Sequence, residues 1–190
     1  LDNFGIDVAL TSTDRVGFHK YTYSNTSDRR VMLDLGHILQ PNWGHKLVSN
    51  DVEVLSNEEI RGTFRTQGWA HFHSVSYRIL FSEPADSIRM FTDGKETPAS
   101  VPSKIHSDKD LKYHFKFPAS DKPLLVKVAL SPVDPDGAVK NMESELPEWD
   151  FDATVAQSEQ VWNEALNRVS MTSSDTVVMK NFYTALYHSM

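Results

Sequence analysis

The pattern of apolar and polar residues changes near Pro132. Before that point, short runs rich in Val, Ile, Tyr, Phe and Thr are separated by Gly, Pro, Asn, Asp and Ser, which is typical of antiparallel strands joined by turns. The pattern favours a mainly β fold, an antiparallel β-sandwich, over βαβ units. The strands that we predict are Gly5 to Leu10, Arg15 to Tyr23, Arg30 to Leu35, Asp51 to Ser56, Glu59 to Gln67, Ala70 to Phe81, Ile88 to Thr92, Leu111 to Phe117 and Leu124 to Leu130.

The strand predicted from Arg15 to Tyr23 has large side chains on both faces. Because successive strand residues point to opposite sides, Val16 and Phe18 lie on one face, and His19 and Tyr21 lie on the other. A strand of this kind suits a sheet that is covered on both sides. We therefore expect a further element to pack on this sheet.

After Pro132 the apolar period becomes helical. A short helix is predicted from Asp136 to Glu145, and Asp150 is suited to cap a second amphipathic helix from Phe151 to about Val169. A third helix is expected to begin near Asp175. This last helix has no Gly, Asn or Pro to end it before the final residue, so we expect more chain to follow.

Composition indicates a folded globular protein. The chain has 190 residues, 39% of them hydrophobic, with a mean hydropathy of -0.42. The net charge of -7 comes from 26 acidic and 19 basic residues spread along the chain, so no basic patch is offered to nucleic acid. No apolar run approaches the roughly 18 residues that span a bilayer, and the first residues do not resemble a secretory signal. The absence of cysteine excludes disulfides and thiolate chemistry.

Two segments carry residues that could bind a metal ion. Trp69, His71 and His73 would share one strand face, but a zinc site needs a third or fourth ligand that no neighbouring residue supplies. The segment from Asp134 to Glu145 has the length of a calcium loop, but its glycine stands at the fourth position and not the sixth. A turn that leads into a helix explains this segment better.

Paired carboxylates are the other source of hydrolytic chemistry. An inverting glycosidase needs an acid and a base about 6.5–9.5 Å apart, and the candidates are Glu58 with Glu59 and Glu143 with Glu145. Acidic neighbours in loops and on helices are more often solvated charges. No catalytic pair is identified in this segment.

Aromatic and imidazole side chains suit carbohydrate, because a flat ring can lie on a sugar face while a ring nitrogen hydrogen-bonds a hydroxyl. The candidates on these grounds are His19, Tyr21, Trp43, His45 and Trp69. The competing interpretation is that Tyr21 and Trp69 belong to the hydrophobic core.

Three stretches resemble glycoside hydrolase family 92. Residues 15–22, RVGFHKYT, resemble the family's RVGFHRYTF strand, and residues 126–151, VKVALSPVDPDGAVKNMESELPEWDF, resemble its passage from strand to helix. VWNEAL at 161–166 and FYTALYHS at 182–189 resemble its linker and following helix. The order and spacing of these stretches also agree, and the similarity runs over nearly the whole chain.

The resemblance implies a supersandwich followed by linker helices and an (α/α)₆ catalytic barrel. It places the β-sandwich domain at 1–132, incomplete at its start, the helical linker at 133–172, and the beginning of the truncated catalytic domain at 173–190. It also implies an inverting exo-α-mannosidase that removes terminal mannose from glycans such as N-glycans. Members are typically secreted, periplasmic or cell-surface bacterial proteins.

The resemblance places the catalytic carboxylates and the calcium ligands in the barrel, after Met190. Calcium is thus the expected cofactor, and mannose-containing glycans and the (α/α)₆ domain are the expected partners, with no metal site in this segment. The predicted substrate-binding residues are His19, Trp43, Trp69 and His188. Two alternatives remain open: a non-catalytic carbohydrate-binding or structural module, and an autonomous hydrolase that uses the carboxylates present here.

Overall fold

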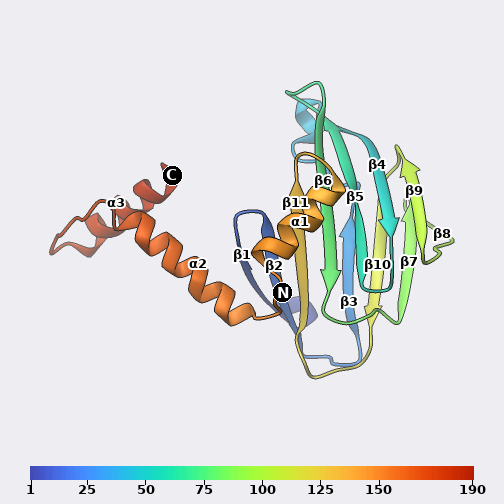
Figure 1. Cartoon of the computed structure of the whole chain (residues 1–190), viewed down its shortest axis with the longest axis horizontal. Coiled ribbons are helices and arrows are strands. Elements are labelled where there is room, and N and C mark those ends of the chain that lie inside the picture. The colour runs from blue at the N-terminus through green and yellow to red at the C-terminus, as the bar shows by residue number, and fades with distance from the viewer. The chain divides into compact units, whose positions relative to one another are not determined.

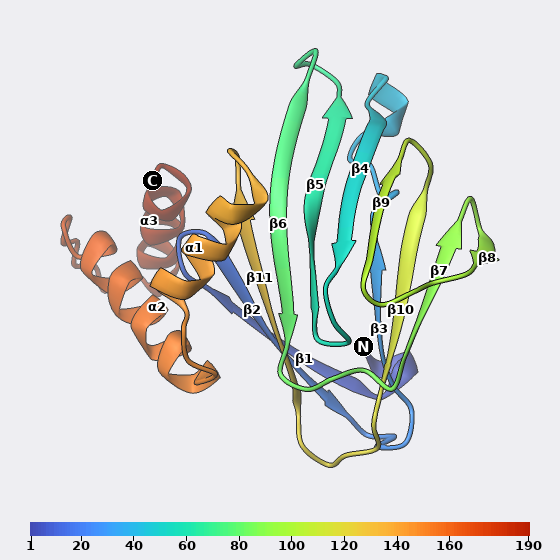
Figure 2. The same ribbon diagram turned by 45° about the vertical axis from the view of Figure 1, so that its right-hand side comes forward.

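The computed structural model describes residues 1–190, which form eleven β-strands, three α-helices and two short 3-10 helices. The chain divides into two compact units, Leu1–Phe151 and Asp152–Met190. The first unit contains all the strands and is shown in Figure 1 and, turned, in Figure 2.

The first unit is built from two antiparallel sheets, which confirms the predicted fold class. The larger sheet has seven strands in the order β1 (Ile6–Ser12), β2 (Val16–Tyr23), β11 (Leu124–Ser131), β6 (His73–Phe81), β5 (Glu59–Gln67), β4 (Lys46–Val54) and β9 (Ser103–Ser107). The smaller sheet has four strands in the order β3 (Arg29–Asp34), β10 (Leu111–Phe117), β7 (Ser87–Thr92) and β8 (Lys95–Thr97).

The core lies between the two sheets, because alternate residues of their strands point inward. In β10, Leu111, Tyr113, Phe115 and Phe117 are all about 1% exposed. The ring of Phe81 in β6 meets Phe115 and Phe117 with centroids 4.8 and 5.1 Å apart. Further core residues from the larger sheet are Tyr23, Val52, Val54, Ile60, Tyr77, Ile79, Leu124 and Val126.

The outer face of the larger sheet is covered by α1 (Pro135–Glu145), which lies against β11 and β6 (Figure 1). The segment that follows α1 covers β2. There the ring of Phe18 lies 6.0 Å from Trp149 and 5.3 Å from Phe151, and Val16 and Phe18 are fully buried. The prediction that this strand is covered on its second face is therefore confirmed.

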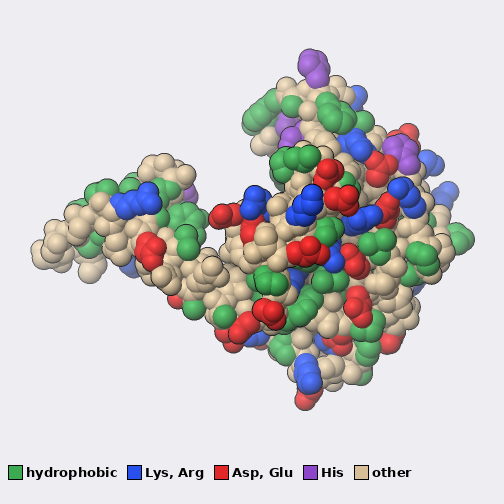
Figure 3. Space-filling view, viewed as in Figure 1, with side chains coloured by type: hydrophobic (Ala, Val, Ile, Leu, Met, Phe, Trp, Pro, Cys, Tyr) green, Lys and Arg blue, Asp and Glu red, His purple; other side chains and the backbone are tan.

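The remaining outer face, over β4, β5 and β9, carries paired charges. Arg61 donates to Glu53 at 2.8 Å and to Asp136 at 3.2 Å. Further along the same face, Asp51 pairs with Arg65 and His106. Figure 3 shows red and blue side chains intermixed over this surface, so opposite charges neutralise one another locally.

The second unit consists of most of α2 (Phe151–Leu166) together with α3 (Thr176–His188). Asp175 caps α3, as its Oδ1 accepts from the backbone N–H of Val177 at 2.8 Å, which confirms the predicted helix start. Within the unit, the rings of Trp162 and Tyr187 lie 4.7 Å apart. No helix of the chain has the length and apolar character needed to cross a membrane.

The structure differs from the predicted elements mainly in the polar strands. β4 begins at Lys46 and not Asp51, and β8 and β9 were not predicted. Residues 103–107 and 95–97 carry little apolar alternation, because β9 and β8 are edge strands with one exposed flank. The strand predicted from Ala70 begins at His73, so Trp69 and His71 lie in a loop and do not share a strand face. α2 ends at Leu166, before Val169.

Candidate functional site

The pairing of β4 with β5 brings two loops together at one end of the larger sheet. Lys46, the first residue of β4, lies opposite Gln67, the last residue of β5. The residues just before Lys46 therefore meet those just after Gln67. We call residues 37–47 and 67–75 the aromatic tip; the first loop contains the 3-10 helix η2 (Pro41–Trp43), and the second joins β5 to β6.

Two tryptophan side chains pack together on this tip. The ring centroids of Trp43 and Trp69 are 5.5 Å apart, with an angle of 33° between the planes. His45 meets Trp69 edge-on at 5.5 Å and 87°. Trp43 is 62% exposed and Trp69 is 78% exposed. The interpretation that Trp69 is a core residue is therefore wrong, whereas Tyr21 does pack partly buried against the core.

Local backbone geometry fixes the tip. Gly44 has a φ of 82°, a left-handed conformation that glycine adopts without strain, and it ends η2 through a bond from its N–H to the Pro41 carbonyl. Gly68 lies flat against the imidazole of His45: a Cβ at this glycine would stand 2.6 Å from the ring. His45 Nε2 is buried there and makes no hydrogen bond.

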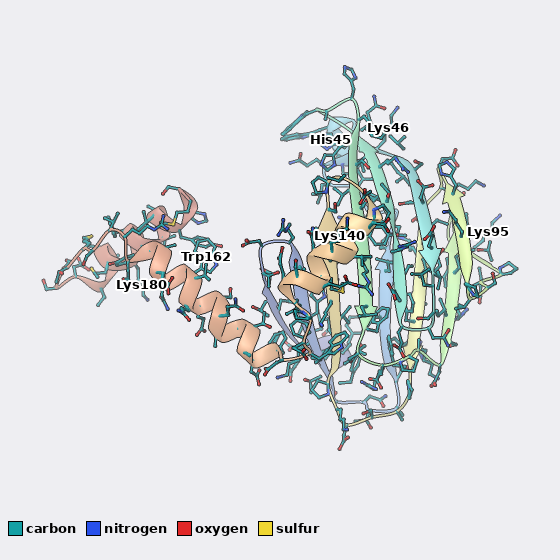
Figure 4. The ribbon with its side chains drawn as sticks, in the orientation of Figure 1. His45, Lys46, Lys95, Lys140, Trp162 and Lys180 are labelled. Carbon is teal, nitrogen blue, oxygen red and sulfur yellow. The ribbon has the colours of Figure 1, made fainter.

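The chemistry of the aromatic tip is apolar and imidazole-rich. It contains two of the four tryptophans and, with His37, His45, His71 and His73, four of the eight histidines, but no Asp or Glu. Phe72 and Leu39 are also exposed. Figure 3 shows green and purple side chains together at this end of the molecule, and Figure 4 labels His45 there.

His19 lies elsewhere on the same sheet. It stands in β2 opposite Val126, and β11 and β6 separate β2 from β5, so it is about 14 Å across the sheet from the strand that leads to Trp69. Its Nδ1 lies 2.9 Å from the Tyr21 hydroxyl. Burial lowers the pKa of His19 and raises the pKa of Tyr21, so burial favours the neutral form of both side chains.

His188 belongs to the second unit. It is the last residue of α3, and its ring meets Tyr187 edge-on with centroids 5.3 Å apart. The structure thus brings Trp43 and Trp69 together, while His19 and His188 stand in other surroundings. A role in substrate binding stays a prediction for each of these four residues.

Two of the four candidate carboxylates, Glu59 and Glu145, are bound by cations or donors of the fold. Glu59 accepts from Arg78 Nε at 2.8 Å. Glu145 accepts from the Thr13 hydroxyl at 2.7 Å and from the backbone N–H of Arg15 at 3.0 Å. The contacts of Glu145 tie helix α1 to the turn between β1 and β2, and the contact of Glu59 joins β5 to β6.

No group of three or more His, Asp or Glu side chains in the chain is arranged to hold a metal ion. Asp134, considered as the start of a calcium loop, is the N-cap of α1 and accepts from the backbone N–H of Gly137 at 2.6 Å. The interpretation of this segment as a turn that leads into a helix is confirmed. The residues present here therefore do not fit a calcium site.

A pocket of about 410 Å³ lies between the turn from Ser12 to Gly17 and the end of β11. Its lining includes Val75, Leu130 and Pro132, and Asp14 is its single carboxylate. A single carboxylate cannot supply the acid and base of a glycosidase. The pocket therefore offers no catalytic pair of carboxyl groups.

Comparison with known families decides the relationship. Residues 1–131 match the glycosyl hydrolase family 92 N-terminal domain. The chain belongs to this family. Residues 137–190 match the family 92 catalytic domain, so the second unit and α1 align with the domain that follows the sandwich.

Solved structures of family 92 enzymes resemble the chain. The α-mannosidase BT3965 from Bacteroides thetaiotaomicron superposes with a TM-score of 0.88 at 25% identity. The match covers 99% of this chain and 25% of the BT3965 chain. The same enzyme has been solved in complex with mannoimidazole. The inverting mannosidase BT2199 from the same species superposes with a TM-score of 0.81 at 16% identity, covering 98% and 24% of the two chains, and supports the fold alone.

A curated relative gives a shorter match. An uncharacterized secreted glycosidase of Arthroderma benhamiae is 35% identical over 68 residues, which are 34% of this chain and 9% of that protein. The chain therefore spans about a quarter of the length of the family 92 structures that it matches and less of this relative.

The sequence makes Trp43 and Trp69 separate candidates and does not show that the two rings are in contact. The pairing of Lys46 with Gln67 decides that contact, and the predicted strand began only at Asp51. A correctly placed start of β4 would have aligned the two loops. Nothing in the local pattern of residues 46–50 gives that start, since the core-facing alternation begins later.

Proposed function

We propose that this chain is the N-terminal sandwich and linker portion of an exo-α-mannosidase that hydrolyses terminal α-linked mannose from glycans with inversion. The observation that supports this proposal is the likeness, at 25% identity over 99% of this chain and 25% of the other, to a family 92 α-mannosidase. The matches to the N-terminal and catalytic domains of the family occur in the same order along the chain.

The domain organisation follows from this proposal. Residues 1–132 form the sandwich, 133–172 the linker and 173–190 the first part of the (α/α)₆ catalytic domain. The sandwich scaffolds one side of the sugar-binding cleft and supplies no catalytic carboxylate. In support, two of the acidic residues considered for catalysis already have partners within the fold. Glu59 is bound by Arg78, and Glu145 is bound by Thr13 and Arg15.

The inverting step needs two carboxyl groups that this chain does not pair. One protonates the oxygen of the leaving sugar while the other removes a proton from the water that attacks the anomeric carbon from the opposite face. Both groups, and the oxygen ligands of the calcium ion that we propose as cofactor, belong to the catalytic domain. We expect aromatic side chains of the sandwich to bind substrate, with Trp43 and Trp69 as the main candidates and His19 as a further one. His188, outside the sandwich, is the fourth candidate.

The test is hydrolysis of α-linked mannobiose by the complete enzyme that carries this chain. Free mannose should appear, and proton NMR during the first turnovers should show the β-anomer. Dialysis against EDTA should abolish release, and added calcium should restore it. Release of the α-anomer would overturn inversion, and undiminished release with EDTA would overturn the calcium requirement.

The alternative function is a carbohydrate-binding or structural module without chemistry, which the exposed Trp43–Trp69 pair also suits. The 190-residue chain should release no mannose by itself. Release by this chain would favour an autonomous hydrolase, and a complete protein that binds mannobiose without hydrolysing it would favour the binding module. We also propose a secreted, periplasmic or cell-surface location, supported by the secreted relative and tested by cell fractionation.

A further inference from the structure

We propose that Trp43, His45 and Trp69 form a platform that binds one neutral pyranose ring of a mannosyl glycan and orients it without cleaving it. We call these three residues the tryptophan platform. The choice of mannose rests on the proposed function, whereas the choice of a neutral sugar rests on the residues themselves.

The first argument is the exposure and arrangement of the rings. Trp43 and Trp69 are 62% and 78% exposed although their ring centroids are only 5.5 Å apart, so the pair offers more exposed aromatic area than one ring alone. The angle between the two ring planes is 33°. The C–H groups on one face of a pyranose need a partner of this kind, because the negative face of an aromatic ring attracts them.

The second argument is that the platform is fixed before any ligand arrives. His45 supports Trp69 edge-on, and Gly68 packs against His45 too closely for any side chain. The pairing of Lys46 with Gln67 holds both loops on adjacent strands. A rigid aromatic surface loses little conformational entropy when a ligand binds, which matters for a ligand that makes few contacts.

The third argument is charge. The aromatic tip has no Asp or Glu, and Lys46 is its single lysine or arginine. Without carboxylates the tip has no acid and base for glycoside hydrolysis, and it has no cluster of cations for a phosphate or an acidic sugar. A neutral ligand is the chemistry that remains.

The surrounding polar groups suit hydroxyls. His71 and His73 are exposed beside Trp69, and an imidazole can donate or accept through its two nitrogens. Figure 4 places His45 at the end of the sheet where the two loops meet. Apolar rings with nearby imidazoles match a sugar, which has one apolar face and a rim of hydroxyls.

The test uses the 190-residue chain and α-linked mannobiose as the probe. Saturation-transfer NMR and chemical-shift titration should give saturable binding with a Kd of roughly millimolar strength, as expected for one ring-stacking contact. Trp43→Ala and Trp69→Ala should each weaken binding about tenfold. Trp69→Phe should retain most of it, because a ring remains. Trp162→Ala is the matched control: it removes a 40% exposed tryptophan of the second unit and should leave binding unchanged.

Folding must be checked in parallel. Both platform tryptophans are exposed, so each variant should keep the wild-type thermal midpoint, and near-ultraviolet circular dichroism should show the other aromatic residues unchanged. Cellobiose and lactose, two other neutral disaccharides, are titrated in the same way. If none of the three disaccharides shows saturable binding, the platform is overturned, whatever the complete enzyme hydrolyses. Binding of cellobiose or lactose in preference to mannobiose would keep the platform and contradict mannose as its ligand. Concentration-dependent dimerisation that Trp69→Ala abolishes would show that a second copy occupies this surface, and would also overturn the proposal.

Discussion

The ammonium group of Lys127 donates a hydrogen bond to the backbone carbonyl of Leu146 across 2.8 Å. Lys127 lies in β11 and is 2% exposed, and Leu146 ends helix α1. The same ammonium donates to the carbonyl of Pro147 at 2.9 Å and lies 4.2 Å from the centre of the Trp149 ring. One buried cation therefore fixes the segment between α1 and α2 to the outer face of the larger sheet.

Replacing Lys127 by Met should destabilise the first unit. Methionine has a similar length but cannot donate, so the Leu146 and Pro147 carbonyls would be buried without a partner. Hydrogen bonds to a charged group contribute about 1.5–3 kcal/mol, and we expect a loss of about 2 kcal/mol. Urea unfolding at pH 7, monitored by circular dichroism, measures this loss in the free energy of unfolding. The exposed Lys140 of α1 gives the control: Lys140→Met should change the free energy of unfolding by less than about 0.5 kcal/mol.

The pH dependence of Lys127 should have an unusual sign. Burial lowers its pKa to about 8, an effect that Arg78 reinforces and Glu148 opposes. Between about pH 8 and the ordinary lysine value near 10.4, the unfolded chain binds a proton that the folded chain has released, so stability rises with pH. Relative to Lys127→Met, the wild-type free energy of unfolding should therefore increase from pH 8 to pH 10.

NMR of chains labelled with ¹³C at lysine Cε gives a direct reading of this ionisation. One lysine signal should titrate near pH 8, and that signal should be missing from Lys127→Met. If every lysine signal titrates near its ordinary pKa, the ammonium stays charged through pH 10, and the predicted rise in stability is wrong.

Glu145 should contribute stability that is lost in acid. Burial alone would raise its pKa, but hydrogen bonds from Thr13 and Arg15 outweigh burial and hold the pKa below the usual value. This contribution is therefore complete above about pH 4.3 and disappears as the pH falls through the folded-state pKa. Glu145→Gln should cost about 1–2 kcal/mol at pH 7 and flatten the acid limb of a stability profile. Glu143→Gln, two residues away and 67% exposed, should do neither.

Gly62 should not tolerate even a methyl group. It lies in β5, and a Cβ there would stand 2.0 Å from the Asp51 carbonyl oxygen and 2.7 Å from the Tyr77 hydroxyl. Alanine normally stabilises a strand relative to glycine by about 0.5–1 kcal/mol, but here β4 or Tyr77 would have to move. We expect Gly62→Ala to lose about 3 kcal/mol or more, measured by thermal unfolding. A stabilised variant would mean that β4 and β5 are farther apart than described.

Removing the cap of α3 tests the second unit. Asp175→Ala deletes the oxygen that accepts from the backbone N–H groups of Val177 and Val178. Loss of an N-cap costs about 1 kcal/mol, so hydrogen exchange in the first turn of α3 should become faster. Ser174→Ala, one residue earlier, should leave exchange in that turn unchanged, and equal effects from the two substitutions would show that Asp175 is not the cap.

The sequence by itself determined the elements whose side chains repeat with a clear period. The runs in β5, β7, β10 and β11 could be read because every second residue faces the core, and α3 because the cap at Asp175 marks its start. The family could also be recognised, since RVGFHKYT and FYTALYHS preserve residue identity as well as period. Each of these signals lies within a few neighbouring positions.

Only the tertiary structure decided which distant residues meet. The contact between Trp43 and Trp69 depends on the register of β4 against β5, and the burial of Lys127 depends on helix α1 returning over β11. A tryptophan or lysine has the same local sequence signal whether it is exposed or buried, because burial is set by chain far away in sequence. Strand pairing and layer packing therefore made Trp69, a possible core residue by sequence, an exposed ring, and made Lys127 an internal anchor.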